Sequence, residues 1–340
     1  EIMAAQPEIL RYANHVADRF DLREHIDFNT RVTAAEYLEA DNLWELSTDS
    51  GGSYRARFCI MATGCLSVPN TPAIEGQETF AGEVYHTGNW PADGVDFSGK
   101  TVGIIGTGSS GVQSIPVIAR EAKHLTVLQR TPNYNLPANN APLPADYRDR
   151  IKNHYTEVRA AQRLAQIGVS EYSRGLGGLG SYAEPTEAIL ETTAEQRAEA
   201  LDRYGFEAIR HYNDLALSEE ANELACDMYR EQVRRVVRDP ETAEGLMPRG
   251  YPYGCKRPVI DIGYFETFNR DNVMLVDLRR GGIEQITPRG VQTAQGAFEF
   301  DVLVYATGFD AMTGALLRMD IRGRGGKRLA SHWEHGPKTY

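Results

Sequence analysis

The chain has 340 residues, which allows two or three domains, and its hydrophobic content of 41% is ordinary for a globular protein. A net charge of −11 argues against a nucleic-acid partner, because nucleic acids require a basic surface. No apolar run approaches the about 20 residues that span a membrane, and no secretory signal is visible. The scattered cysteines contain no C-x-x-C pair, which predicts a reduced, cytoplasmic setting without a structural metal.

The first part of the chain is predicted to be a helix followed by strands. Residues 4–19 carry apolar side chains at helical spacing, with Pro7 in the first turn, where a helix tolerates proline. From Ile26 onward, short alternating runs separated by turn residues predict a three-stranded meander. The meander leads into residues 57–64 (RFCIMATG), which we expect to form a buried strand that ends at Ala-Thr-Gly.

A βαβ unit is predicted next along the chain. Residues 101–105 (TVGII) have the pattern of a short apolar strand, residues 110–122 of a helix, and residues 124–129 (HLTVLQ) of a second strand. A glycine loop, GTGSSG, lies between the first strand and the helix. Before this unit, residues 66–100 are rich in proline and glycine and are predicted to be an interdomain linker.

The second half of the chain repeats part of the first. Residues 141–249 are mostly polar amphipathic helix, which predicts a helical insertion. A second meander then ends in another apolar strand with Ala-Thr-Gly, at residues 306–308. This internal repeat indicates an α/β fold with two dinucleotide-binding domains, Rossmann-like and three-layered. The expected parts are the remainder of a first nucleotide domain (1–65 and 306–340), the linker (66–100), a second nucleotide domain (101–140 and 250–305) and the insertion (141–249).

The glycine loop is the clearest candidate for binding a nucleotide, because it follows an apolar strand and opens a helix. Its first glycine permits the tight turn, the second lets the backbone approach a pyrophosphate, and the third allows helix and strand to pack closely. The helix that begins near Ser109 points its free N–H groups at the phosphates. The expected cofactor-binding residues of the loop are Gly106, Thr107, Gly108, Ser109, Ser110 and Gly111.

The first copy of the repeat has no such loop, since no G-x-G-x-x-G occurs between residues 1 and 64. We therefore expect the chain to be a fragment whose first nucleotide loop lies upstream. A further match to the pattern, at Gly175, Gly177 and Gly180, follows SEYSR rather than an apolar strand. A flexible loop is the better interpretation there.

Cationic residues after the second strand indicate which dinucleotide is bound. An acidic residue there would accept a hydrogen bond from the ribose of NAD, but the chain has Arg130 and Thr131. A guanidinium matches a 2′-phosphate, so NADP is favoured over the alternative of a simple surface arginine. Lys256 and Arg257 lie in the loop GYPYGCKRP, whose composition suits either a side chain held over a site or a solvated surface.

Residues 80–91 fit the pattern F-x-G-x-x-x-H-x-x-x-W-P, with Phe80, Gly82, His86 and Trp90 at its fixed positions. An isolated histidine is more often structural than catalytic, and nothing nearby supplies the nucleophile or carboxylate of a hydrolase. The place of His86 in the predicted linker favours a role in coupling domains, and Trp90 can anchor the linker through its buried area.

This pattern resembles the fingerprint of type I Baeyer–Villiger monooxygenases, and the similarity extends over essentially the whole chain, including GTGSSG, QRTPN, GYPYGCKRP and ATGFDAMTGAL. Trp90 favours that family over the flavin-containing monooxygenases, whose shorter motif lacks the tryptophan. The resemblance implies an enzyme that uses NADPH, FAD and O₂ to convert ketones into esters or lactones through a C4a-peroxyflavin. Its expected partners are small-molecule ketones and O₂, with neither nucleic acid nor membrane.

The resemblance also assigns roles. It makes Arg257 the active-site arginine above the flavin and places Lys256 with Arg130 and Thr131 at the 2′-phosphate of NADP. The implied flavin contacts are Val32, Thr63, Gly64 and Asp310. The chain departs from the family because it lacks the first glycine loop, the acidic partner of the arginine and the C-terminal substrate loop. We therefore expect these residues alone neither to retain FAD nor to turn over.

Two other interpretations remain open at the level of the sequence. The first is an N- or S-oxygenating flavin monooxygenase of related fold, which product analysis with a ketone, an amine and a thioether would distinguish. The second is a non-catalytic NADP-binding fragment.

Overall fold

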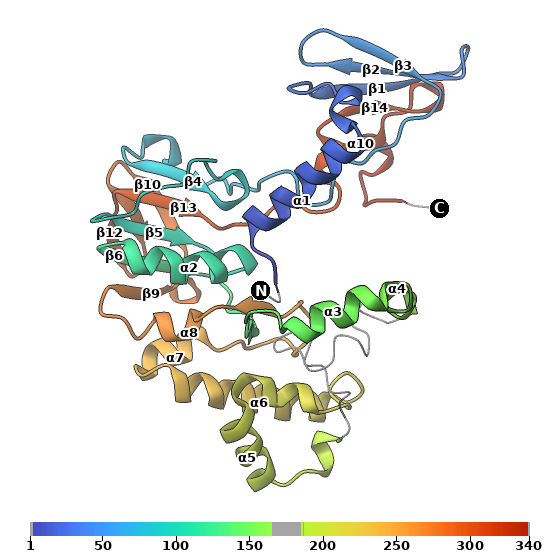
Figure 1. The fold of residues 1–340 in the computed structure, drawn as a ribbon. Coiled ribbons are helices and arrows are strands. Elements are labelled where there is room, and N and C mark those ends of the chain that lie inside the picture. Colours follow the sequence, from blue (N-terminus) through green and yellow to red (C-terminus); the bar gives the residue numbers. More distant parts are fainter. Residues whose placement is uncertain (1–2, 165–184, 186, 339–340) are drawn as a thin grey trace. The chain divides into compact units, whose positions relative to one another are not determined.

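The computed structural model describes residues 3–164, 185 and 187–338 (Figure 1). The chain divides into two units. Unit 1 comprises Glu1–Ala4 and Pro72–Thr307, and unit 2 comprises Ala5–Thr71 and Gly308–Tyr340. None of the described helices is both long and apolar enough to cross a lipid bilayer.

Unit 1 is built on a five-stranded parallel sheet with the strand order β4-β13-β5-β6-β9. Its strands are short runs rich in Val, Ile and Leu, the composition of strands that are covered on both faces. Helix α2 (Ser109–Glu121) connects β5 to β6, which confirms the predicted βαβ unit. The strands are β4 (Glu83–His86), β5 (Thr101–Ile105), β6 (His124–Gln129), β9 (Val273–Asp277) and β13 (Val302–Tyr305).

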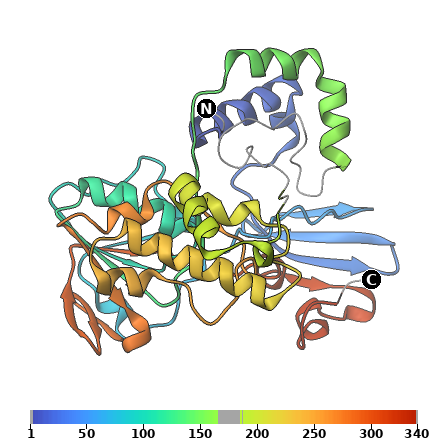
Figure 2. The ribbon, with the colours of Figure 1, turned by 90° about the horizontal axis from the view of Figure 1, so that it is seen from below.

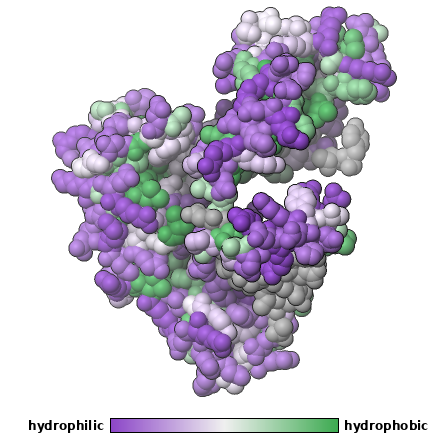
Figure 3. Space-filling model, viewed as in Figure 1, coloured by the Kyte–Doolittle hydropathy of each residue, from purple (hydrophilic) through white to green (hydrophobic). Residues whose placement is uncertain are grey.

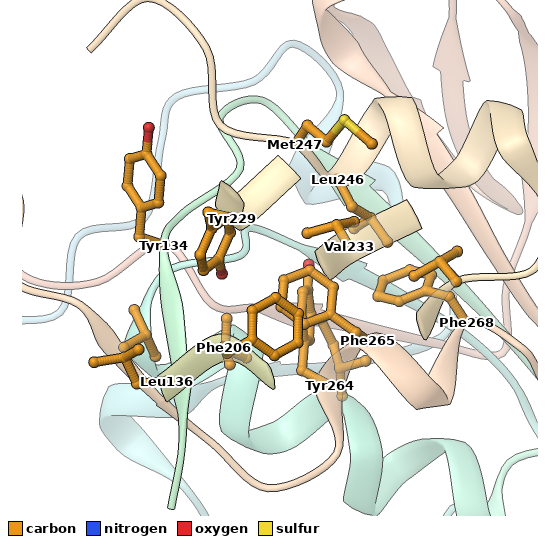
Figure 4. Close-up of a cluster of buried hydrophobic side chains, with 14 of the residues drawn as sticks. Tyr134, Leu136, Phe206, Tyr229, Val233, Leu246, Met247, Tyr264, Phe265 and Phe268 are labelled. Carbon is orange, nitrogen blue, oxygen red and sulfur yellow. The ribbon is translucent and has the colours of Figure 1, made fainter. Parts of the chain in front are cut away.

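Helices α5 (Ala194–Tyr204), α6 (Glu219–Val236) and α7 (Pro240–Leu246) lie together in unit 1 (Figure 2). Tyr229 of α6 belongs to the same hydrophobic cluster as Ile104 of β5. Figure 4 shows part of this cluster, in which the rings of Phe206 and Phe265 stack with their centroids 4.9 Å apart. The predicted helical insertion therefore shares its core with the sheet. Other helices of this unit are α3 (Ala145–Asn153), α4 (Tyr155–Leu164) and α8 (Tyr264–Thr267).

The starts of these helices follow from their sequences. The side chains of Thr193, Ser218 and Asp239 accept backbone N–H groups in the first turns of α5, α6 and α7. Such caps satisfy N–H groups that have no partner within a helix, and each contributes about 1 kcal/mol. Asp239 is followed by Pro240, whose missing N–H costs nothing at the first helical position.

The second meander forms as predicted, as a three-stranded antiparallel sheet of β10 (Ile283–Thr287), β11 (Gly290–Thr293) and β12 (Gly296–Glu299). Ile286 and Val291 of this sheet share a hydrophobic cluster with Leu303 of β13. A separate parallel pair consists of β7 (Asn135–Pro137) and β8 (Val259–Asp261).

Unit 2 contains helix α1 (Gln6–Arg19) and a four-stranded sheet with the order β14-β1-β2-β3. The predicted helix and first meander are thus confirmed. None of the α1 residues is buried, and Ile9, Leu10 and Tyr12 are all exposed. Hydrophobic side chains also appear on the surface of the molecule in Figure 3. The elements of unit 2 besides α1 are β1 (Val32–Leu38), β2 (Leu43–Thr48), β3 (Ser53–Ala56), β14 (Asp320–Arg322), α9 (Gly314–Leu317) and α10 (Leu329–His332).

The prediction of a buried strand at residues 57–64 is wrong. No strand is assigned there, and Phe58 and Ile60 are 75% and 86% exposed. No described strand pairs with this segment, so its backbone N–H and C=O groups have no ladder to join. The apolar pattern alone was therefore not sufficient to make a strand.

The stretch at 66–100 is also more ordered than the predicted linker. Its residues 83–86 form β4, which pairs with β13 at the edge of the sheet of unit 1. The division between the two units lies within this stretch, between Thr71 and Pro72. The glycine-rich match at residues 175–180 lies outside the described residues.

Candidate nucleotide-binding site

The candidate site lies at the carboxyl edge of the sheet of unit 1. Because the strands are parallel, the residues that end or follow β4, β5 and β6 meet at that edge. They are His86, the loop from Gly106 to Gly111, and Arg130. Ligands of open α/β sheets bind at this edge, and the glycine loop and Arg130 both lie there.

Two glycines of the loop are required by the protein's own backbone. Gly106 has a φ of +107°, and a Cβ there would lie 2.6 Å from the carbonyl oxygen of Ala306. A Cβ at Gly111 would lie 2.2 Å from the carbonyl oxygen of Gly106. The first glycine therefore makes the tight turn next to β13, and the third allows α2 to pack against the turn.

Gly108 is different, because no atom of the described residues lies within 4 Å of the position that its Cβ would occupy. Packing within the chain does not explain why this position is glycine. It is also the N-cap of α2, and no side chain caps the N–H groups of that helix. Open space and uncapped N–H groups together fit a pyrophosphate, which accepts hydrogen bonds from a helix N-terminus.

The loop is held in place by the segment that follows β6. The hydroxyl of Thr107 donates to the carbonyl oxygen of Thr131 at 3.2 Å, and the side-chain amide of Asn133 donates to the carbonyl oxygen of Thr107 at 2.6 Å. Thr107 and the main chain of Thr131 thus connect the two cofactor-binding segments predicted from the sequence.

Arg130 points outward because its neighbour points inward. Gln129 ends β6 fully buried, and its amide donates to the carbonyl oxygen of Gly245 at 2.8 Å. Successive side chains of an extended chain alternate in direction, so Arg130 is exposed. Its side chain makes no hydrogen bond or ion pair with a described residue. A guanidinium at this strand end is available for a 2′-phosphate.

The loop that carries Lys256 is joined to the same segment through Tyr251. The Tyr251 hydroxyl donates to the carbonyl oxygen of Pro132 at 2.5 Å, and burial raises the pKa of this phenol to about 12. The ammonium of Lys256 lies over the ring of Tyr251, 4.5 Å from its centroid. Lys256 therefore contacts Tyr251, which is hydrogen-bonded to Pro132, two residues after Arg130.

Helix α6 fixes the rest of that loop. The side chain of Asn222 accepts from the backbone N–H of Tyr253 at 2.9 Å and donates to its carbonyl oxygen at 3.0 Å. Arg257 follows in the same loop, exposed and without an ion pair to a described residue. Two residues later, Val259 enters β8 and is buried. Arg257 is thus a solvent-facing cation on a braced loop.

An ion pair closes the neighbouring strand end. The guanidinium of Arg279 contacts the carboxylate of Asp277 at 2.7 Å and donates to the carbonyl oxygen of Gly245 at 2.9 Å. Burial alone would raise the pKa of Asp277, but the hydrogen bonds and charge of Arg279 outweigh it and lower the pKa. Arg279 and Gln129 both donate to the carbonyl oxygen of Gly245, so this oxygen links the end of β9 to the end of β6.

Most of the fingerprint residues lie in or next to β4 and contact β13 or the residues that flank it. Phe80 packs on the hydrophobic cluster of β13, and a Cβ at Gly82 would lie 2.4 Å from the carbonyl oxygen of Asp301. His86 accepts the N–H of Gly88 at its Nδ1, so its Nε2 faces the hydroxyl of Thr307 at 3.2 Å. Trp90 is 38% exposed and packs on Tyr85 and Phe97.

The expected flavin contacts lie in unit 2. Thr63 and Gly64 precede a segment that runs antiparallel to residues 308–312. In that pairing the N–H of Asp310 donates to the carbonyl oxygen of Val68 at 2.9 Å. Val32 begins β1 and pairs with Thr48 of β2. The structure therefore brings Thr63, Gly64 and Asp310 onto adjoining segments, and among the described residues Val32 makes no hydrogen bond with them.

Sequence patterns missed several residues of the site. Asn133, Tyr251, Tyr264 and Thr307 all contact loop or strand-end residues that are distant in sequence. Asn133, Tyr251 and Thr307 fall in motifs noted above, QRTPN, GYPYGCKRP and ATGFDAMTGAL, but the motifs did not indicate these contacts. No periodicity could have found Tyr264, because its partner Gln129 is 135 residues away.

The two clefts described for unit 1 do not coincide with the glycine loop. One of about 900 Å³ lies at the opposite edge of the sheet, where Glu83, Thr101 and Asp301 begin or precede their strands. The other, of about 800 Å³, lies between the start of α6 and the loop that carries Tyr251. The site is therefore identified by its backbone geometry and charges and not by cavity size.

Comparisons with known proteins agree with this geometry. The family model for pyridine nucleotide-disulphide oxidoreductases matches residues 2–224. A 2-oxo-Δ³-4,5,5-trimethylcyclopentenylacetyl-CoA monooxygenase of Pseudomonas putida is 42% identical over 100% of this chain and 62% of its own length. A cyclohexanone 1,2-monooxygenase of an Acinetobacter species is 41% identical over 98% of this chain and 60% of its own length. The chain thus spans about three fifths of the curated relatives it matches.

The solved structures give the same result. A crystal structure of OTEMO in complex with FAD and NADP matches 99% of this chain and 63% of its own length, with a TM-score of 0.89 and 41% identity. That likeness is high enough in sequence as well as in fold to indicate common descent. The chain therefore belongs to the pyridine nucleotide-disulphide oxidoreductase family and is a homologue of the type I Baeyer–Villiger monooxygenases.

Proposed function

We propose that this chain binds NADPH through unit 1 and is part of a flavin-dependent Baeyer–Villiger monooxygenase that converts ketones into esters or lactones with O₂. The observation that carries the proposal is the glycine loop at the carboxyl edge of the sheet, open at Gly108 and flanked by Arg130 and Lys256. The homology to ketone monooxygenases supports the reaction class.

In this proposal the pyrophosphate of NADPH lies against Gly108 and accepts the uncapped N–H groups at the start of α2. The 2′-phosphate is bound by the guanidinium of Arg130 and the ammonium of Lys256, with Thr131 at the same strand end. Charge-assisted hydrogen bonds of this kind contribute about 1.5–3 kcal/mol each. Since no carboxylate follows β6, the ribose 2′-OH of NAD would lack its usual acceptor.

The flavin would be held in part by Val32, Thr63, Gly64 and Asp310 of unit 2. When bound, the nicotinamide supplies a hydride and the flavin supplies activated oxygen. Arg257 is proposed to stabilise the negative charge that develops on oxygen while the ketone is attacked. Arginine suits this role because it stays charged at every working pH and does not release its proton.

Product analysis tests the proposed reaction. The full-length enzyme of which this chain is proposed to be part is incubated with FAD, NADPH and O₂, together with a cyclic ketone, an amine or a thioether, and the products are identified by mass spectrometry. We expect lactone from the ketone. Formation of only N-oxide or sulfoxide would replace the proposal with the related N- or S-oxygenating class. NADP⁺ binding without any oxygenation would support the non-catalytic alternative.

Replacing Arg257 tests its role within the same assay. Arg257→Ala should lower ester or lactone formation by about 100-fold or more, the cost of removing one preorganised electrostatic donor, while flavin reduction by NADPH continues. Arg257→Lys should restore only part of the rate, because an ammonium lacks the planar fork. A near-normal rate in the alanine variant would show that Arg257 is a surface cation.

A further inference from the structure

A hydrogen bond from Tyr251 joins the loop that carries Lys256 to the segment that follows β6. The Tyr251 hydroxyl donates to the carbonyl oxygen of Pro132 at 2.5 Å. Burial raises the pKa of this phenol to about 12, so the hydroxyl keeps its proton at neutral pH and is the donor. Pro132 follows Arg130 by two residues. The loop is therefore bonded to the same strand end that carries the Arg130 guanidinium.

Tyr251 is also held from the opposite side. The hydroxyl of Tyr134 donates to the carbonyl oxygen of Tyr251 at 3.3 Å and lies 3.0 Å from the sulfur of Cys226. The Tyr134 ring is only 2% exposed, and it meets the rings of Tyr251 and Tyr253 edge-on, with centroids 5.4 and 5.3 Å apart. Tyr251 is thus fixed at its hydroxyl, its ring and its carbonyl oxygen.

A tight turn brings Lys256 back over this ring. The backbone N–H of Cys255 donates to the carbonyl oxygen of Pro252 at 3.3 Å, which closes a four-residue turn. Gly254 is the third residue of the turn and has a φ of +89°, the position at which a type II turn requires glycine or asparagine. The chain reverses there, and the ammonium of Lys256 lies 4.5 Å from the centroid of the Tyr251 ring.

The ring holds Lys256 without cancelling its charge. Lys256 is exposed and makes no hydrogen bond or ion pair with a described residue. A carboxylate partner would neutralise the ammonium, whereas the face of an aromatic ring attracts it and leaves its N–H groups free for an anion. A lysine side chain is otherwise flexible, so the ring restricts where this cation can lie.

We propose that Tyr251 is a positioning residue that keeps Lys256 at the strand end of Arg130, and that through Lys256 it sets the preference of the site for NADP over NAD. This inference rests on the proposed function of unit 1, in which Lys256 binds the 2′-phosphate. Tyr251 touches no part of the dinucleotide in this account. It holds a cation that only a dinucleotide with a 2′-phosphate can use.

The experiment uses the full-length enzyme of which this chain is proposed to be part, and titrates it with NADP⁺ and with NAD⁺ in a calorimeter. Tyr251→Phe keeps a ring beside Lys256 and removes the bond to Pro132. It should weaken NADP⁺ binding by about three- to tenfold, the range for one lost hydrogen bond, and leave NAD⁺ binding nearly unchanged. The ratio of the two affinities should therefore fall by about threefold or more.

A double-variant cycle shows whether Tyr251 acts through Lys256. Lys256→Ala should lower the affinity ratio by about tenfold or more, the scale of a lost charge-assisted contact. Adding Tyr251→Phe to Lys256→Ala should change the ratio no further, because the cation that Tyr251 positions is gone. A tyrosine that only stabilised the loop would have the same effect with and without Lys256.

Two variants of the turn and one distant tyrosine complete the set. Gly254→Ala should strain the turn and lower the ratio, whereas Gly254→Asn should keep it, because asparagine tolerates a positive φ. Tyr229→Phe is the control for loss of a buried hydroxyl. Tyr229 is 1% exposed, and its hydroxyl bonds the main chain of Asn135. This control should lower the melting temperature and leave the ratio unchanged.

The titrations distinguish failure of the inference from failure of the proposed function. An unchanged ratio in Tyr251→Phe, or an equal fall with and without Lys256, would overturn the inference. An unchanged ratio in Lys256→Ala would contradict the proposed function and the inference with it, because Lys256 would then make no contact with the 2′-phosphate. If Tyr251→Phe folds poorly, Gly254→Ala decides: a fall that disappears in the Lys256→Ala background supports the inference, and an unchanged ratio overturns it.

Discussion

Residues 58–64 (FCIMATG) and 302–308 (VLVYATG) have nearly the same sequence pattern and different structures. Residues 302–305 form β13, paired on one side with β4 and on the other with β5, and fully or almost fully buried. Residues 58–61 form no strand, and Ile60, which corresponds to Val304, is 86% exposed. An apolar run becomes a strand only when neighbouring strands satisfy its backbone groups.

The turn that follows each run does not differ. Gly64 has a φ of +74° and Gly308 a φ of +79°, both in the left-handed region that favours glycine. Such a turn depends on one residue, whereas a strand depends on partners far away in the sequence. The comparison therefore separates a local feature, which both copies keep, from a non-local one, which only the second copy forms.

The largest expected effect comes from placing a charge at the matched positions of the two runs. Val304→Asp buries an unpaired carboxylate in the middle of the sheet and should destabilise unit 1 by about 4 kcal/mol or more. Ile60→Asp should change stability by no more than about 0.5 kcal/mol, because the side chain already faces solvent. Urea unfolding followed by circular dichroism measures both, and equal losses would erase the proposed difference between the runs.

Two substitutions in the glycine loop beside β13 distinguish an effect of backbone strain from an effect on ligand binding. Gly106→Ala puts a Cβ 2.6 Å from the carbonyl oxygen of Ala306 at a φ of +107°, so it should cost about 2–3 kcal/mol of stability. Gly108→Ala meets no atom within 4 Å and should leave stability almost unchanged. It should nevertheless weaken NADP⁺ binding by about tenfold or more, because its Cβ occupies the space assigned to the pyrophosphate. Normal binding by Gly108→Ala would argue against that assignment.

Arg130→Ala tests whether the guanidinium that follows β6 binds the 2′-phosphate of the dinucleotide. The change should weaken NADPH binding by about 1–3 kcal/mol, the scale of a lost charge-assisted contact, and should leave NADH nearly unchanged. Fluorescence titrations with both dinucleotides measure the effect. A useful control is Arg120→Ala, which removes an exposed cation from the last turn of α2. Equal losses for NADPH and NADH would count against a 2′-phosphate contact.

The smallest effect concerns the pH dependence of the end of β9. The pKa of Asp277 is lower in the folded chain, so the unfolded chain takes up its proton first as the pH falls. The ion pair with Arg279 therefore stabilises the fold above about pH 4 and is lost as the pH falls through the folded pKa. Between about pH 5 and 3, the unchanged chain should lose about 1 kcal/mol more than Asp277→Asn. Asp271→Asn, at an exposed carboxylate, should follow the unchanged chain, and identical pH profiles for all three would contradict the expected contribution.

The outcome of sequence prediction follows the same division between local and distant interactions. The βαβ unit, both meanders and the turn glycines depend on short runs of residues, and the sequence predicts them. The strand predicted at 57–64 does not form, and residues 83–86 of the predicted linker form a strand, because pairing partners decide both outcomes. Likewise, the loop and Arg130 could be chosen from motifs, but the contact of Tyr264 with Gln129 and that of Thr307 with His86 could not, since each crosses more than a hundred residues of sequence.

We propose that the second copy of the repeat binds a nucleotide and that the first copy does not retain one in this chain. Titration of the purified chain with NADP⁺ and with FAD, followed by desalting and absorbance spectra, tests it most directly. We expect NADP⁺ to bind at one site per chain and FAD to be lost on desalting, because the run at 58–64 forms no buried strand. A protein that retains one flavin per chain and does not bind NADP⁺ would contradict the account.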